Sequence, residues 1–252
     1  MINRRKITPS KMTIPGPSKH TVESVIASLQ KVAKKSYRDG MARFAIPSDK
    51  AFGVPVGTMR QMAKRIGQNH ELAAGLWETG WYEGRMIAVF LDEPGRVTPT
   101  QMDRWCRDFD NWAICDTACF HLFDRTPHAW KKVSQWSRKK EEFEKRAAFA
   151  TLWSLSVHDK KADNARFAEG LLLIEREAHD ERNFVKKAVN MALRAIGKRN
   201  GELHATAMAV AKRLSAASQP AAARWVGKDA LRELASSSVS RRLAAKKVAG
   251  KK

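Results

Sequence analysis

The sequence predicts an all-α protein whose helices stack as a helical-repeat solenoid. Apolar residues recur at helical spacing along most of the 252-residue chain, and no segment shows the strict apolar–polar alternation of a strand. Weakly similar helical pairs also return at intervals of roughly 35–45 residues, which is typical of stacked helical repeats. A compact helical bundle stays open on pattern alone, because short connections make neighbouring helices antiparallel in both architectures.

The apolar stripes follow one another along the chain. In each stripe, apolar side chains recur three to five residues apart, so they lie on one face of a helix. The clearest stripes begin at Val22, Met59, Phe143, Phe184 and Leu203. We expect about a dozen helices of roughly 10–16 residues with short connections between them.

Residues with known cap preferences mark several helix boundaries. Residues 98–101 combine Thr98, Pro99 and Gln101, which predicts an N-cap, a proline at the first helical position and a capping box. Further N-caps are expected at Asp110, Asp180 and Asn200. Gly80 and Gly197 are expected to end helices.

Both ends of the chain are basic and contain no acidic residue. Residues 1–20 carry five lysines and arginines, and residues 236–252 carry six. We therefore expect a flexible basic arm over 1–20, one folded domain over 21–235, and a disordered basic tail or frayed helix over 236–252.

The net charge points to a polyanionic partner. The chain carries 47 Lys and Arg against 26 Asp and Glu, a formal charge of +21. Without the two ends, 36 basic residues still face 26 acidic ones, so the folded part itself is basic. Such a surface suits nucleic acid or an anionic membrane, and the alternative is an ordinary domain with two solvated tails. No apolar run reaches the roughly 18 residues of a membrane span, so no membrane insertion is expected.

Cysteine usage predicts a reducing compartment, so we expect a cytoplasmic protein associated with the nucleoid. Cys115, Cys119 and His121 have some resemblance to a zinc-binding pattern, but a structural zinc site needs a fourth ligand, and none stands at a suitable spacing. Buried free cysteines are the better interpretation. We expect neither a metal nor a cofactor, because no glycine-rich phosphate loop is present either.

The most informative segment runs from residue 108 to 116. Trp112 and Asp116 are four residues apart, so they share a helix face. A carboxylate beside an indole is unusual on a core stripe and indicates a site. The alternative is that Trp112 packs in the core while Asp116 caps a helix or pairs with an arginine.

A second candidate is a row of cations on a later helix. Lys187, Met191 and Arg194 share one face by their spacing, and Lys198 extends it. A basic row along an otherwise apolar helix suits contacts with DNA phosphates. A solvated lysine-rich face is the alternative.

These segments together resemble the AlkD-like DNA alkylation repair glycosylases, a family built of HEAT-like repeats. The similarity spans roughly residues 37–235. The motifs that carry it are Asn111-Trp112-x3-Asp116, Lys145-Arg146-x-Ala148 and Phe184-Val185-x-Lys187-Ala188-x3-Ala192-Leu193-Arg194, preceded by Phe52-Gly53-Val54-Pro55 with Arg60, and by Leu76-Trp77 with Tyr82-Glu83-x-Arg85.

The resemblance implies a C-shaped solenoid whose basic concave face holds alkylated duplex DNA. It also implies a monomeric enzyme without cofactor that excises N3- and N7-alkylated purines. The catalytic Asp of the family falls on Asp116, its first active-site Trp on Trp112, and its active-site Arg on Arg146. A phosphate-contacting Arg matches Arg194. The second active-site Trp falls on Met191, where this sequence departs from the family.

Two other functions stay open on the sequence. One is a non-catalytic protein of the same fold that binds damaged or branched DNA. The other is a helical-repeat protein scaffold or RNA binder. An abasic product from DNA with N7-methylguanine distinguishes the enzyme from both. Steeply salt-dependent duplex binding distinguishes the DNA binders from the scaffold.

Overall fold

The computed structural model describes residues 20–218 and 220–249, and within these ranges every regular element is a helix. The α-helices are α1 (Val22–Lys31), α2 (Lys35–Asp39), α3 (Val56–Ile66), α4 (His70–Glu78), α5 (Tyr82–Leu91), α6 (Pro99–Arg107), α7 (Trp112–His121), α8 (Ala129–Trp136), α9 (Glu142–His158), α10 (Asn164–Glu177), α11 (Asn183–Gly197), α12 (Gly201–Ala216), α13 (Ala221–Leu234) and α14 (Ser237–Ala249). Two 3-10 helices, η1 (Met41–Phe44) and η2 (Phe123–Arg125), complete the order. None of the described helices is long and apolar enough to cross a membrane.

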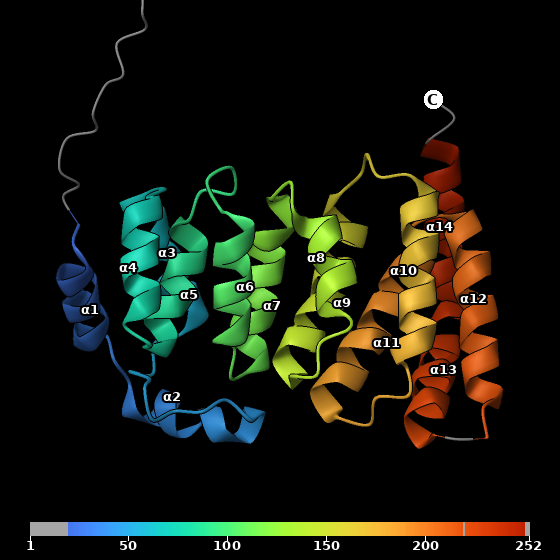
Figure 1. The fold of residues 1–252 in the computed structure, drawn as a ribbon, viewed down its shortest axis with the longest axis horizontal. Coiled ribbons are helices and arrows are strands. Elements are labelled where there is room, and N and C mark those ends of the chain that lie inside the picture. The colour runs from blue at the N-terminus through green and yellow to red at the C-terminus, as the bar shows by residue number, and fades with distance from the viewer. Residues whose placement is uncertain (1–19, 219, 250–252) are drawn as a thin grey trace, which may run out of the picture.

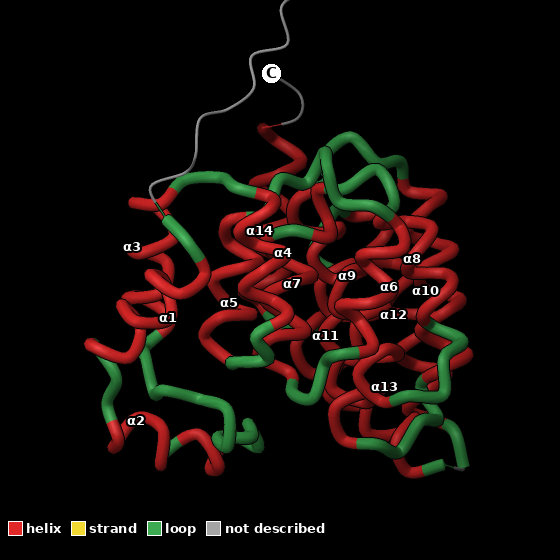
Figure 2. Tube along the Cα trace, turned by 60° about the vertical axis from the view of Figure 1, so that its left-hand side comes forward, coloured by secondary structure: helices red, strands yellow, loops and turns green. Residues whose placement is uncertain are grey.

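The helices form two layers in a row, as a helical-repeat solenoid requires (Figure 1). We call α3, α5, α7, α9, α11 and α13 the inner layer, because each contacts the next along the row. The outer layer consists of α4, α6, α8, α10 and α12, which pack against the inner helices. Figure 2 shows the same arrangement from the side, with loops only at the helix ends. The predicted all-helical solenoid is therefore confirmed.

One hydrophobic core runs through the row, and large aromatic side chains join successive helices within it. The indoles of Trp77 on α4 and Trp105 on α6 stack with their ring centroids 4.0 Å apart. Trp136 on α8 is fully buried and donates from Nε1 to Asp103 of α6. Stacked aromatic rings add to the stability gained from burial alone, so Trp77, Trp105 and Trp136 belong to the core, whereas Trp225 is 40% exposed.

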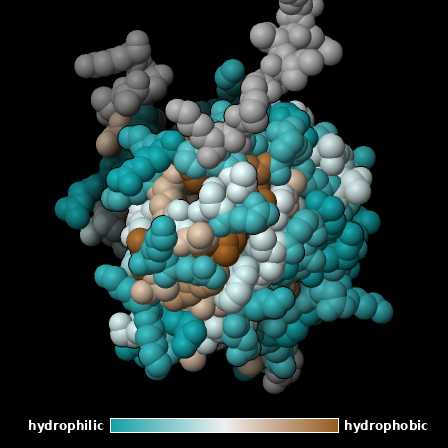
Figure 3. All heavy atoms as spheres, turned by 90° about the vertical axis from the view of Figure 1, so that its left-hand side faces the viewer, coloured by the Kyte–Doolittle hydropathy of each residue, from teal (hydrophilic) through white to brown (hydrophobic). Residues whose placement is uncertain are grey.

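The two ends of the row are finished differently. At the N-terminal end, a groove of about 390 Å³ between α1 and α3 is lined in part by Val25, Val32, Met62 and Ile66. Figure 3 views this end and shows hydrophobic side chains among hydrophilic ones. At the C-terminal end, Val239 of α14 is buried.

Of the two alternatives for the tail, a disordered segment or a helix, the structure has a helix over residues 237–249, α14. The Nζ of Lys246 donates to the carbonyl oxygens of Lys198 and Arg199 at the end of α11. These contacts and the burial of Val239 fix the helix on the domain. Most of the predicted arm, residues 1–19, lies outside the described residues.

Some helix starts match the prediction. Thr98 accepts from the backbone N–H of Gln101, with Pro99 in the first turn. The Gln101 side chain does not complete the capping box, because it donates to Asp92. Asn200 caps α12 as expected, accepting from Leu203.

Two predicted N-caps are wrong. The cap of α7 is Asn111, whose buried side chain accepts from Ile114 N at 3.0 Å, while Asp110 only accepts from the Asn111 amide. Arg182 occupies the cap position of α11, and Asp180 instead accepts from Arg182.

The two glycine stops have different outcomes. Gly80 lies between α4 and α5 with φ of 69°, a left-handed conformation that glycine adopts without strain and that ends helices. Gly197 is the last residue of α11 itself, and Lys198 takes the C-cap position.

Candidate functional site

A pocket of about 500 Å³ opens on the inner layer, where α7, α9 and α11 meet the end of η1. Five residues predicted from the sequence line it: Trp112, Asp116, Arg146, Lys187 and Met191. Its remaining lining residues are Arg43, Phe44, Ala45, Asn183 and Phe184. The fold thus brings three separate sequence motifs to one cavity.

Asp116 and Arg146 form a two-point ion pair at the back of this pocket. Arg146 donates from Nε to Oδ1 at 2.9 Å and from Nη2 to Oδ2 at 2.7 Å. Its Nη1 donates to the carbonyl oxygen of Phe184 at 2.7 Å. The Arg146 side chain is only 4% exposed, against 17% for Asp116. Arg146 therefore stands behind the carboxylate, and its guanidinium is engaged by Asp116 and by the carbonyl oxygen of Phe184.

Two effects act against each other on the Asp116 carboxyl. Burial raises the pKa of Asp116, and the adjacent Arg146 guanidinium pulls it down. The parallel N–H···O bonds also fix the plane of the carboxylate, since a guanidinium meets a carboxylate in one flat arrangement. An oriented carboxylate that lines a pocket is suited to stabilising a positive charge that forms nearby.

The indole of Trp112 is held by a partner that the sequence did not indicate. Its Nε1 donates to the carbonyl oxygen of Phe44 at 2.7 Å. The next residue, Ala45, has φ of 53°, and among the described residues it is the one non-glycine in the left-handed region. The turn ends η1 here and aims the Phe44 carbonyl at Trp112.

The segment that carries Phe44 is fastened to the rest of the fold by a buried acid. The Glu83 carboxylate on α5 accepts from the backbone N–H groups of Phe52, Gly53 and Val54 at 2.8–3.0 Å. Gly53 has φ of 87°, and a Cβ there would lie 2.4 Å from the Lys34 carbonyl oxygen. The sequence contained Gly53 and Glu83, but no local pattern showed that they meet.

The predicted cationic row on α11 divides in the structure. Lys187 is exposed at the pocket rim, one helical turn from Met191 in the lining. Arg194 and Lys198 instead donate to the carboxylate of Glu233 on α13. Asp229 of α13 also lies 3.8 Å from Nη1 of Arg194, so two carboxylates face these two cations. Lys187 is therefore the cation of this row that lines the pocket.

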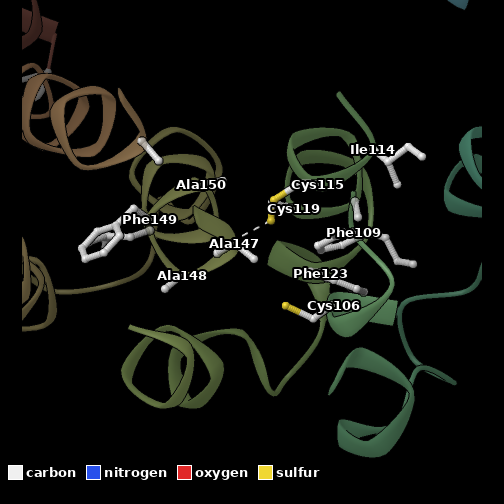
Figure 4. Close-up of a cluster of buried hydrophobic side chains, with 14 of the residues drawn as sticks. Cys106, Phe109, Ile114, Cys115, Cys119, Phe123, Ala147, Ala148, Phe149 and Ala150 are labelled. Carbon is white, nitrogen blue, oxygen red and sulfur yellow. Dashed lines mark hydrogen bonds between the residues drawn. The ribbon is translucent and has the colours of Figure 1, made fainter. Parts of the chain in front are cut away.

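The cysteines lie in the core between α6, α7 and α9 (Figure 4). Cys115 and Cys119 donate from Sγ to the carbonyl oxygens of Phe143 and Ala147. Burial raises the pKa of the Cys115 thiol well above its usual range, whereas metal binding needs a thiolate. The Nε2 atom of His121 instead lies 2.9 Å from Nη2 of Arg60. The zinc alternative is therefore unsupported, and the described residues contain no cluster of metal-ligating side chains.

A solved structure shares this fold. It comes from "a new family of proteins related to the HEAT-like repeat DNA glycosylases with affinity for branched DNA structures". The two chains are 21% identical, with a TM-score of 0.70, and the match covers 84% of this chain and 95% of the other. No curated protein matches this chain in sequence.

Family membership rests on the sequence match. The sequence model of the family described as "DNA alkylation repair enzyme" matches residues 25–234. That range includes the inner and outer layers and every pocket-lining residue named above. The chain therefore belongs to the DNA alkylation repair enzyme family.

Proposed function

We propose that this protein is a DNA glycosylase that removes N3- or N7-alkylated purines from duplex DNA. The carrying observation is that Trp112, Asp116 and Arg146, which come from two sequence motifs, line one open pocket. The basic composition of the chain supports a polyanionic substrate.

The chemistry of the lesion suits a site with one carboxylate. Alkylation at N3 or N7 gives the purine a positive charge, so the base leaves as a neutral molecule and needs no general acid. Positive charge then develops on the deoxyribose, as in other glycosidic cleavages. The Asp116 carboxylate stabilises that charge and orients the attacking water.

The neighbours of Asp116 serve this step in different ways. Arg146 is a positioning residue, because its two N–H groups hold both carboxylate oxygens in place. It also counteracts the effect of burial, which otherwise favours the protonated acid. Trp112 is fixed through Phe44, so its ring can offer a π-face to the cationic base.

The test is single-turnover excision from duplexes that contain one N7-methylguanine or one N3-methyladenine. Asp116→Asn keeps the shape of the side chain and removes its charge. We expect excision to fall about 10²–10³-fold, while duplex affinity stays the same or rises because a carboxylate repels phosphate. Asp110→Asn is the matched control, because Asp110 is exposed and caps no helix. Excision at the wild-type rate by Asp116→Asn would refute the mechanism.

A second candidate function is binding of damaged or branched DNA without catalysis. Two observations favour it: both Asp116 oxygens are engaged by Arg146, and Met191 stands where the resemblance places a second active-site tryptophan. On this hypothesis the wild-type protein leaves both lesions intact. It would bind a three- or four-way junction more tightly than a duplex of the same length.

A further inference from the structure

A second hollow lies on the inner layer, about 330 Å³ in volume, between α3, α5 and α7. Its lining contains cations and no carboxylate: Arg60, Ala63, Lys64, Gly67, Gln68, Phe90 and His121. Arg60 and Lys64 are one helical turn apart on α3, so they share a face.

Arg60 is held in place by neutral partners. Its Nη2 lies 2.9 Å from His121 Nε2, and its guanidinium lies over the Phe90 ring, 5.4 Å from the centroid. Burial, aided by the charges of Arg60 and Arg125, lowers the pKa of His121 to about 4. A guanidinium can only donate, so His121 Nε2 accepts and the ring proton sits on Nδ1. The imidazole therefore orients Arg60 without adding or cancelling charge.

Neither cation is neutralised in the part of the chain that the structure describes. Arg60 and Lys64 are both exposed and form no ion pair there. Arg194 and Lys198 on the same layer differ, because Glu233 accepts from both. An oriented arginine beside a lysine, with no competing carboxylate, is suited to a DNA phosphate.

Helix α7 borders both the hollow and the Asp116 pocket. The partly exposed residues of α7 are Trp112, Ala113, Asp116, Thr117, Phe120 and His121. They cover about half of the helix circumference, with Trp112 and Asp116 toward the pocket and His121 toward the hollow. Asp116 and His121 are five residues apart, which is about 7.5 Å along the axis. Because one short helix borders both hollows, they are neighbours on the inner layer, and a duplex bound at one lies beside the other.

We propose that Arg60 and Lys64 form a phosphate-binding site that holds the backbone of duplex DNA beside the Asp116 pocket. The proposal rests on the proposed DNA-directed function, but it concerns binding and not base excision. It assigns the contact with the DNA backbone to α3, whereas the sequence indicated the cationic row on α11.

The experiment measures binding of an unmodified 20-base-pair duplex to the full chain at several salt concentrations. We expect Arg60→Gln/Lys64→Gln to bind about 10-fold more weakly at low salt, with a log–log salt slope smaller by about two. Lys131→Gln/Lys212→Gln is the matched control, because these lysines are exposed on outer helices α8 and α12. The control removes the same charge and should change the slope much less.

Lysine acylation of the wild-type protein gives a second measurement that needs no variant. Bound duplex should protect Lys64 and leave Lys131 reactive. Wild-type binding by Arg60→Gln/Lys64→Gln, or an equal loss in the control pair, would overturn the proposal, as would unprotected Lys64. If these variants lose binding while the wild-type protein excises neither lesion, the phosphate site stands and the glycosylase proposal fails. If Arg60→Gln/Lys64→Gln binds the duplex and excises the lesions as the wild-type protein does, only the phosphate-site proposal fails.

Discussion

The two ends of the inner layer differ in whether their cationic side chains are paired with acidic ones. Around α3 and α7, Arg60 is oriented by an uncharged imidazole and keeps its full charge available. Around α11 and α13, Arg194 and Lys198 meet the carboxylate of Glu233. A row of cations in a sequence therefore does not by itself mark a binding face, because an acid some 35 residues later can neutralise it.

The largest effect is expected at Arg146, whose side chain is only 4% exposed and is paired with Asp116. Arg146→Gln leaves the Asp116 carboxylate buried without a countercharge. Removing one partner of a buried pair typically costs about 3–5 kcal/mol, so we expect a Tm lower by roughly 10 °C. Arg213→Gln is the control, since its partner Glu175 forms an exposed pair worth about 0–1 kcal/mol.

The same variant has a signed pH dependence. Burial raises the pKa of Asp116, and Arg146 is the group that opposes this. Without the arginine, the folded-state pKa stands further above the unfolded value, so the fold favours the protonated acid. The stability deficit of Arg146→Gln should therefore grow as pH rises above the unfolded-state pKa of aspartate, about 3.9, as measured by urea unfolding. A deficit independent of pH would contradict this account of the pair.

The contrast can also be reversed by freeing the paired cations. Glu233→Gln should release Lys198 and remove the closer of the two acidic partners of Arg194, which keeps only Asp229 at 3.8 Å. We expect tighter duplex binding and a log–log salt slope steeper by up to about two, since each phosphate contact contributes about 0.9. Binding titrations at several salt concentrations measure both quantities.

The matched control for this variant is Glu175→Gln, which frees Arg213 between the outer helices α10 and α12. It makes the same change in net charge away from the inner layer. We expect little change in its salt slope. Equal steepening by both variants would mean that net charge, and not position on the inner layer, governs DNA binding.

The sequence predicted the parts of the molecule that depend on local periodicity. Helices, their packing as a solenoid and the shared face of Trp112 and Asp116 all follow from spacings of three or four residues. The resemblance added Arg146, which lies 30 residues from Asp116 along the chain. Of the two interpretations of Asp116, the structure contains the arginine pair, and the same carboxylate also lines the pocket.

The features that the sequence did not predict share a physical cause. Each depends on a contact between residues far apart in the chain, or on burial that only the complete fold determines. Nothing near Trp112 indicates that Phe44, 68 residues earlier, holds its indole. Glu233 likewise acts on Lys198 across 35 residues. The N-cap of α7 was missed by one position, because Asp110 and Asn111 are both good caps and only the burial of Asn111 decides between them. The tail contains a helix whose Val239 is buried, so of the two alternatives left open by the sequence the helix is the one present.

Met191 gives the smallest expected effect and the sharpest question about the pocket. The resemblance places a tryptophan at this position, and methionine keeps an apolar, polarisable surface without the aromatic face. If a cationic purine enters the pocket, Met191→Trp should offer it a second π-face opposite or beside Trp112. A cation–π contact of about 0.5–1.4 kcal/mol corresponds to roughly two- to tenfold faster excision under single-turnover conditions.

Two controls separate this effect from a general gain in DNA affinity. Met208→Trp adds the same indole to outer helix α12, away from the pocket, and should leave excision unchanged. Asp116→Asn/Met191→Trp should be as inactive as Asp116→Asn alone, because the indole assists a step that still needs the carboxylate. A slower Met191→Trp enzyme with normal duplex binding would mean that the lesion needs the space at this position and does not contact it.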